Sequence, residues 1–375
     1  GPVTPDHVIR TKPWPLALQA ERAIAPFVTR YQHYFDAHAP NVKEAKTMLD
    51  PAPRVLLDSQ WGLLTAGRTA KDAQIVADIY QHTLQCMQRA EQLGGWRALP
   101  ERDLFDMEYW DLEQAKLRKG GAAPALQGEV VLVTGAASGI GRACVAAYQK
   151  AGAAVIALDR DPKIEELASV SVYAVCVDVT DRVAMQAAIT QGVAQFGGLD
   201  MLVLNAGLFP ASKRITELED EAWSRVMGVN LDANLALLRM THPLLKRAPR
   251  GGRVVVMGSR NVPAPGPGAA AYSASKAALT QLMRVAALEW AEDGIRINAL
   301  HPDAVYDTAI WEGGVLEARA AHYGMSVEDY KRRNLLQTEV TSAEVANLAV
   351  ALCGPLFART TGAQIPIDGG NERVI

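Results

Sequence analysis

A glycine-rich loop between an apolar run and a helical pattern constrains the fold of this chain most strongly. Residues 129–133 form a short, mostly apolar run of the length of a buried strand. The loop Thr134-Gly135-Ala136-Ala137-Ser138-Gly139-Ile140-Gly141 follows directly, and a helical pattern continues to residue 150. Glycines let the backbone turn tightly and approach a pyrophosphate, whose charge is met by amides at the start of the helix. This order predicts a dinucleotide-binding turn.

Strand and helix patterns alternate after this loop. Short apolar runs at 153–158, 174–177, 201–204, 253–257 and 296–300 predict strands, and the segments 182–196 and 217–245 predict helices. Repeated strand–helix units are typical of a parallel sheet covered by helices on both faces. We therefore expect an α/β fold, a Rossmann-like doubly wound parallel sheet, with ligands bound at the carboxyl ends of its strands.

Acidic residues after two of these strands point to the cofactor. Asp159 closes the second strand, eighteen residues after Gly141, where a carboxylate can accept hydrogen bonds from both hydroxyls of an adenosine ribose. The same carboxylate repels a 2′-phosphate, and positions 136 and 137 hold no basic residue to offset it. NAD is therefore favoured, although Arg160 could turn toward a phosphate and keeps NADP open. Asp178 and Val179, after the third strand, are expected on the adenine side.

A hydroxyl, a phenol and an amine suited to proton transfer follow the fifth strand. Ser259 comes just after the run 253–257, Tyr272 lies thirteen residues further on, and Lys276 is at i+4 on the same face of a predicted helix. A phenol has an unperturbed pKa of about 10, which a fixed neighbouring cation lowers toward neutral pH. Ser259 can then hold a substrate oxygen while Tyr272 moves its proton. From the two helix residues alone, an ordinary surface pair is the alternative.

Together these motifs resemble the short-chain dehydrogenase/reductase family over residues 126–375. The matching features are TGAASGIG at 134–141, NAG at 205–207, Asn230, Ser259 and YSASK at 272–276. The resemblance implies that Tyr272 is the general acid and base and that Lys276 lowers its pKa and holds the nicotinamide ribose. It also implies that Ser259 polarises the substrate oxygen and that Asn230 orders a water relay. These four residues are the predicted catalytic group.

The resemblance also assigns the dinucleotide contacts, with one departure. It implies that the cofactor is lined by Gly135, Ser138, Gly139, Ile140, Gly141, Asn205, Ala206 and Gly207, with Tyr272 and Lys276 at its nicotinamide end. After the strand 296–300 the sequence reads His301-Pro302-Asp303-Ala304-Val305-Tyr306-Asp307-Thr308, whereas the family usually has Pro-Gly and a threonine one position earlier. We expect Pro302 and Val305 near the nicotinamide amide.

Sequences near both ends resemble a narrower group. PDHVIRTKPWPL at 5–16, FDMEYWDLEQAKL at 105–117, LHPDAVYDTAIW at 300–311, NLLQTEVTS at 334–342 and TTGAQIPIDGGNERVI at 360–375 are similar to bacterial bifunctional proteins that join a class II aldolase to a dehydrogenase, of the rhamnulose-1-phosphate aldolase/lactaldehyde dehydrogenase type. Such an aldolase needs a metal cradle with a His-x-His pair, which this sequence lacks. With a Gly-Pro start and no initiator methionine, this suggests a fragment, a processed form, or a relative that kept only oxidoreductase chemistry.

The expected domain boundaries follow from that resemblance. Residues 1–95 are expected to be an α+β region like the aldolase tail without a metal site, 96–127 a helical linker, and 128–375 the short-chain dehydrogenase domain. Five prolines before residue 27 argue against a long helix at the start. Two short strands around a turn are expected at 53–64, then a helix at 69–93 capped by Thr69, and a second helix at 101–119.

Composition limits the partners and the compartment. The 38 basic and 41 acidic residues nearly balance, which gives no reason to expect nucleic acid, and no apolar run approaches the length of about 20 residues that spans a bilayer. The four cysteines are far apart without CxxC spacing, which fits a reducing cytoplasm. The histidines before residue 90 show no metal-ligand spacing, so we expect no metal site.

The substrate is expected at the strand ends, under a lid at 310–334. The candidate substrate residues are Phe209, Ser259, Arg260, His301, Tyr306 and Trp311, which favour a small polyhydroxylated or 2-hydroxy carbonyl compound such as lactaldehyde or a deoxy-sugar-derived alcohol from rhamnose catabolism. A buried structural role for His301 and a solvent-facing role for Arg260 stay open. An aldolase-type lyase acting on a sugar phosphate and a non-catalytic nucleotide-binding protein are the competing functions. The apolar helix at 272–292 predicts a homodimer or homotetramer.

Overall fold

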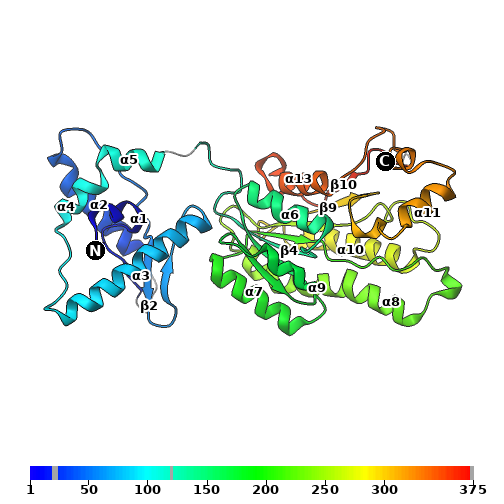
Figure 1. Ribbon diagram of the computed structural model, residues 1–375, viewed down its shortest axis with the longest axis horizontal. Helices are drawn as coiled ribbons and strands as arrows, with labels where there is room; N and C mark the ends of the chain where they lie inside the picture. The colour runs from blue at the N-terminus through cyan, green and yellow to red at the C-terminus, as the bar shows by residue number, and fades with distance from the viewer. Residues whose placement is uncertain (19–23, 119–120, 372–375) are drawn as a thin grey trace. The chain divides into compact units, whose positions relative to one another are not determined.

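The computed structural model describes residues 1–18, 24–118 and 121–371 (Figure 1). The chain divides into two compact units, Gly1–Ala123 and Pro124–Ile375. Within the described residues, no helix is long and apolar enough to cross a membrane. Each unit has its own sheet and its own buried core, so each is described separately.

The first unit is built on a three-stranded sheet in the order β1-β2-β3. β1 (Leu16–Ala17) runs parallel to β2 (Val55–Asp58), and β3 (Gly62–Thr65) is antiparallel to β2. The turn between β2 and β3 closes on Asp58, whose carboxylate accepts two backbone N–H groups. α3 (Ala70–Gln92) then begins at Thr69, whose hydroxyl accepts from the Asp72 N–H at 3.0 Å. The predicted strands, turn and helix cap are confirmed.

A long helix near the start of the chain differs from the expectation based on proline content. α2 (Ala25–His38) contains Pro26 in its first turn, where a missing N–H breaks no helical hydrogen bond. The remaining short elements are a 3₁₀ turn at Pro5–His7, α1 (Val8–Thr11), and a 3₁₀ turn at Ala39–Asn41. The unit has an aromatic core, to which α2 contributes three residues: Trp14, Phe27, Tyr31, Tyr34, Phe105 and Tyr109.

The structure corrects the helical linker expected at 96–127. The helix expected at 101–119 is two helices, α4 (Glu101–Glu108) and α5 (Asp111–Arg118), with a break at Tyr109 and Trp110. Phe105 is buried and stacks on Tyr109 with ring centroids 4.5 Å apart. α4 is therefore part of the first unit's core, and the chain divides at 123 and 124 rather than at 95 and 127.

The second unit contains a seven-stranded parallel sheet in the order β10-β9-β8-β7-β4-β5-β6. The strands are β4 (Val130–Thr134), β5 (Ala154–Asp159), β6 (Val172–Cys176), β7 (Met201–Leu204), β8 (Arg253–Met257), β9 (Arg296–Pro302) and β10 (Gln364–Ile367). From β4 the chain builds outward through β5 and β6 and then returns to add β7 on the other side. The order reverses between β4 and β7, where ligands of such sheets bind. The predicted doubly wound fold is confirmed.

Helices cover both faces of this sheet (Figure 1). α6 (Gly139–Lys150) and α13 (Ser342–Cys353) pack together on one face, and the Tyr148 hydroxyl donates to the Ala349 carbonyl at 3.1 Å. α7 (Arg182–Phe196), α9 (Ala233–Leu245) and α10 (Ala270–Glu289) lie on the other. α8 (Asp220–Met227) leads into α9 through a π turn, and α11 (Val315–His322) and α12 (Val327–Lys331) follow β9.

Replacing Phe105 by alanine tests whether α4 is core or linker. Phe105→Ala removes a buried ring from an aromatic cluster and should lower the free energy of unfolding of the first unit by about 3–5 kcal/mol. Trp110→Ala, at a ring that is 49% exposed, is the control and should change it little. Calorimetric unfolding of the full chain measures both, and equal small effects would restore the linker interpretation.

Candidate active site

One cavity of about 1330 Å³ lies at the carboxyl ends of the central strands of the second unit. Its walls come from the loops after β4, β5, β6, β7, β8 and β9, from α10, and from the segment that contains α11 and α12. Its volume exceeds the roughly 300–1,000 Å³ typical of drug-sized ligands, so a dinucleotide and a small substrate fit together.

The glycine loop forms one end of the cavity. Gly135 and Gly139 have φ of +68° and +49°, which favour glycine, and a Cβ on Gly141 would overlap the Gly135 carbonyl oxygen. The Asn205 amide donates to the Thr134 and Gly135 carbonyls at 3.0 and 3.2 Å, which holds the loop against the end of β7. Gly135, Ser138, Gly139 and Ile140 line the cavity with Asn205, Ala206 and Gly207, whereas Gly141 lies behind and lets the loop close.

The acidic strand ends line the cavity beside the loop. The Asp159 carboxylate accepts from the Ala137 N–H at 2.9 Å, which fixes it at the end of β5. Asp178 accepts from the N–H and the hydroxyl of Thr180, and these hydrogen bonds hold its pKa below the usual value. Arg160 and Val179 line the same region. The glycine cradle and these carboxylates fit the pyrophosphate and adenosine of a dinucleotide.

Ser259, Tyr272 and Lys276 line the same cavity. Ser259 follows β8 and its side chain hydrogen bonds to Tyr272, while its Oγ accepts from the Asn261 N–H at 3.1 Å. Lys276 is buried one turn along α10 from Tyr272, and its Nζ donates to the Met257 carbonyl at 2.7 Å. The Phe209 ring packs edge-on against the Tyr272 ring, with centroids 4.7 Å apart. All four side chains line the cavity.

The pKa of Tyr272 moves in the opposite direction to the one expected. Burial raises it, the Ser259 hydrogen bond lowers it, and the Asp303 carboxylate raises it. Burial also lowers the pKa of Lys276 to about 8. The Lys276 amine donates to the Met257 carbonyl and is not among the groups that shift the pKa of Tyr272, so it does not offset the desolvation of the phenol. In the protein alone, Tyr272 therefore holds its proton at neutral pH.

Asn230 supports the site from behind rather than facing the cavity. It lies in the π turn Gly228–Asp232 and is fully buried. Its Oδ1 accepts from the Leu208 N–H at 2.7 Å, and its Nδ2 donates to the Leu208 carbonyl and the Ser275 hydroxyl, both at 3.0 Å. The side chain expected to order a water relay thus ties the loop after β7 to α10.

The predicted substrate residues divide into two groups. Phe209, Ser259, Arg260 and Trp311 line the cavity, as do the cofactor residues Pro302 and Val305. His301 is buried outside it, with Nδ1 3.1 Å from the Ser259 nitrogen and 2.9 Å from the Ser259 carbonyl oxygen. Tyr306 packs against Trp311 and Tyr330 in a small cluster. His301 and Tyr306 therefore hold other residues in place. For His301 this agrees with the buried structural role that the sequence left open.

Several cavity residues were not singled out from the sequence. Arg319, Tyr323 and Arg333 are such residues. Thr308 and Asp303, which belong to the unusual motif at 301–308, also line the cavity, and the Asp303 carboxylate pairs with Arg260 at 3.3 Å. The available signals were the unusual motif at 301–308 and the lid expected at 310–334. These two signals did not indicate which side chains would face the cavity. The helices of the lid segment are too short for a repeating pattern of apolar residues that would identify the inward face. The Thr308 methyl group lies against Gly139 and brings the displaced threonine back to the glycine loop.

Comparison with known proteins agrees with this geometry. Residues 135–372 match the family described as enoyl-(acyl carrier protein) reductase, and residues 1–117 match the second domain of class II aldolases. The uncharacterized oxidoreductase YuxG of Bacillus subtilis is 30% identical over 99% of this chain, and the chain spans 57% of that protein's length. An uncharacterized NAD-dependent oxidoreductase of Mycobacterium tuberculosis is 34% identical over 66% of this chain and 96% of its own length.

A solved structure has a similar fold. The crystal structure of 3-ketoacyl-(acyl-carrier-protein) reductase from Brucella melitensis complexed with NADH has a TM-score of 0.59, is 28% identical, and covers 67% of this chain and 100% of its own. The fold and the site define an oxidoreductase of the short-chain type that uses a nicotinamide cofactor. The chain belongs to the short-chain dehydrogenase/reductase family and carries a unit of the class II aldolase second-domain type before its oxidoreductase unit.

The burial of Lys276 predicts a pH dependence of stability. Its pKa is about 8 in the folded state against an ordinary value of 10.5, so the cost of burying the ammonium is largest below pH 8 and disappears as pH rises toward 10.5. Without cofactor, wild type should therefore gain up to about 3 kcal/mol relative to Lys276→Met between pH 7 and pH 10.5. Urea unfolding measures the difference. The exposed Lys150→Met is the control, and a pH-independent difference for Lys276→Met would contradict the prediction.

Proposed function

We propose that this oxidoreductase is NAD-dependent and moves a hydride between nicotinamide and a small sugar-derived hydroxy or carbonyl compound. The observation that carries the proposal is that one cavity is lined both by the glycine loop and by Ser259, Tyr272 and Lys276. A dinucleotide bound along it brings its nicotinamide end to the proton-transfer group. Catalysis then depends chiefly on position and on a proton, since the cofactor supplies the redox chemistry.

Ser259 and Tyr272 handle the substrate oxygen in this mechanism. A nicotinamide held by the residues of this cavity would donate or accept the hydride. In carbonyl reduction, Ser259 donates a hydrogen bond to the substrate oxygen, and Tyr272 gives its proton to that oxygen as hydride reaches the carbon. In alcohol oxidation the same proton returns to the phenolate as hydride leaves the carbon. Because burial raises the pKa of Tyr272, reduction is favoured at neutral pH and oxidation increases as pH rises.

Asp159 supports NAD over NADP. Its carboxylate lines the adenosine end of the cavity, where it can accept from two ribose hydroxyls and repel a 2′-phosphate. Positions 136 and 137 are both alanine and offer no cation to offset that repulsion. Arg160 is the neighbouring group that would favour NADP instead.

Polar and aromatic groups at the substrate end support a small hydrophilic substrate. Arg260 enters the cavity directly after Ser259, and Trp311, Arg319 and Arg333 line the wall formed by the lid segment. Arginine side chains hydrogen bond to hydroxyl and carboxyl oxygens and stack on aromatic rings, which suits a 2-hydroxy carbonyl or polyol. Lactaldehyde and deoxy-sugar-derived alcohols have this chemistry, and we propose that the protein acts in rhamnose catabolism in the cytoplasm.

A substrate panel tests the function. Wild type should oxidise or reduce lactaldehyde, polyols or deoxy-sugar-derived acids with NAD in preference to NADP, with or without a chelator. Tyr272→Phe should lower kcat by roughly 100- to 10,000-fold, because it removes the transferable proton while leaving the ring in place. NADH fluorescence titration should show unchanged cofactor binding. Better turnover of steroids or long-chain alcohols, or full activity in Tyr272→Phe, would overturn the proposal.

We also propose that the chain forms a homodimer or homotetramer through α10. Val285 and Leu288 on this helix expose apolar side chains to solvent, Leu288 to 81%. Burying such a stripe against its copy removes apolar surface from water. In this family the corresponding helix commonly pairs in that way.

A charge placed on α10 tests the assembly. Light scattering at micromolar concentration should give a dimer or tetramer for wild type and a smaller species for Leu288→Asp. Val183→Asp, at an equally exposed valine on α7, is the matched control and should leave the mass unchanged. A monomeric wild type would contradict the proposal.

A further inference from the structure

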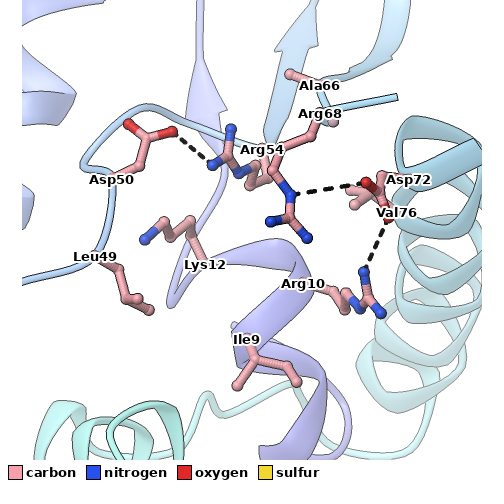
Figure 2. A pocket seen from close by; sticks show the side chains of 11 residues that line it. Ile9, Arg10, Lys12, Leu49, Asp50, Arg54, Ala66, Arg68, Asp72 and Val76 are labelled. Atoms are coloured by element: carbon pink, nitrogen blue, oxygen red, sulfur yellow. Dashed lines mark hydrogen bonds and ion pairs between the residues drawn. The ribbon is translucent and has the colours of Figure 1, made fainter. Parts of the chain in front are cut away.

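The first unit contains a small cavity that the oxidoreductase chemistry does not use. It has a volume of about 200 Å³ and lies between α1, the segment before β2, and the start of α3 (Figure 2). Ile9, Leu49 and Val76 form its apolar wall. We propose that it binds the phosphate group of a small phosphorylated molecule through Arg10, Lys12, Arg54 and Arg68.

The four cations reach the cavity from separate segments. Arg10 and Lys12 come from α1 and the residue that ends it, Arg54 precedes β2, and Arg68 precedes α3 (Figure 2). A tetrahedral phosphate offers oxygens in several directions, so donors on different elements can each meet one. A planar carboxylate is better matched by a single bidentate arginine. The spread of the donors therefore favours phosphate.

The carboxylates in the cavity do not balance these cations. Asp50 and Asp72 are the acidic residues among its lining. Asp50 pairs with Arg54 at 2.6 Å, while Asp72 is shared by Arg10 at 3.2 Å and Arg68 at 3.9 Å. A guanidinium group has five N–H donors, so each arginine in such a pair keeps donors for a further acceptor. Glu108, which lies outside the lining, pairs with Lys12, so the four cations face three carboxylates and one positive charge is left for an anion to neutralise.

Lys12 places a buried cation in the wall of the cavity. Its side chain is 5% exposed, and its Nζ lies 3.4 Å from the buried Glu108 carboxylate and 3.9 Å from the centre of the Tyr31 ring. Its φ of +69° with ψ of 167° is a backbone conformation that side chains rarely adopt, and such residues cluster at ligand clamps. Burial lowers the pKa of Lys12, Glu108 raises it, and the nearby Arg54 charge lowers it again. A phosphate beside Lys12 would favour its charged form.

The size of the cavity limits the ligand. Its volume is below the roughly 300–1,000 Å³ of sites for drug-sized ligands, so it accepts free phosphate or a compact phosphomonoester. In the second case the apolar wall would contact the carbon part. Inorganic phosphate and glycerol 3-phosphate are probes that distinguish free phosphate from a phosphomonoester as the ligand.

Titration calorimetry on the full chain tests the proposal, with saturating NADH present to occupy the phosphate-binding loop of the second unit. Phosphate or glycerol 3-phosphate should bind with one site per chain, whereas chloride at matched ionic strength should release no comparable heat. Arg68→Gln should weaken binding by about tenfold, because it removes one charged donor. Arg68 is 61% exposed, so this variant should fold normally. Arg54→Gln is the second variant, and Arg89→Gln, an exposed arginine on α3 outside the cavity, is the matched control.

The results separate binding here from other causes. Weaker binding in both cavity variants with unchanged binding in Arg89→Gln supports the proposal, and tighter binding of glycerol 3-phosphate than of phosphate identifies a phosphomonoester as the ligand. No binding in the presence of NADH, an equal heat with chloride, or the same affinity in all three variants would overturn it.

Discussion

The buried ammonium of Lys276 is the interaction on which the site depends. Its hydrogen bond to the Met257 carbonyl ties α10 to the end of β8, and Ser259 follows two residues later. The bond therefore sets the distance at which Ser259 and Tyr272 face each other. Burying a cation costs free energy, which its lowered pKa reflects, and a site that needs a charge beside the nicotinamide end accepts this cost.

The parts of the fold and site that follow from local rules could be predicted from the sequence. The glycine loop, the alternation of strands and helices and the cap at Thr69 each depend on a few neighbouring residues, and the structure contains them as expected. The i+4 spacing of Tyr272 and Lys276 likewise placed both on one face of α10. The direction of the Tyr272 pKa could not be predicted, because it depends on burial of the phenol and on the Asp303 carboxylate, and only the fold brings these to Tyr272.

Tertiary contacts explain what the sequence could not show. The sequence does not show whether a buried amide such as Asn230 hydrogen bonds to a ligand or to the backbone. In the structure it hydrogen bonds to the backbone N–H and carbonyl of Leu208, in the loop after β7. His301 is the same case, because Gly258 leaves the space in which its ring reaches the Ser259 backbone. Half of the residues in the segment 101–118 are charged, and the segment was expected to be part of a linker. Phe105 and Tyr109 from this segment nevertheless complete the aromatic core of the first unit.

A crystal structure of the protein with NADH and a substrate carbonyl compound tests the central claim most directly. The account predicts the pyrophosphate on the amides of the loop that contains Gly139, the adenosine ribose on Asp159, and the Tyr272 hydroxyl within hydrogen-bond distance of the substrate oxygen beside the nicotinamide ring. A dinucleotide bound away from the glycine loop, or a nicotinamide ring on the side of the cavity remote from Tyr272, would contradict it.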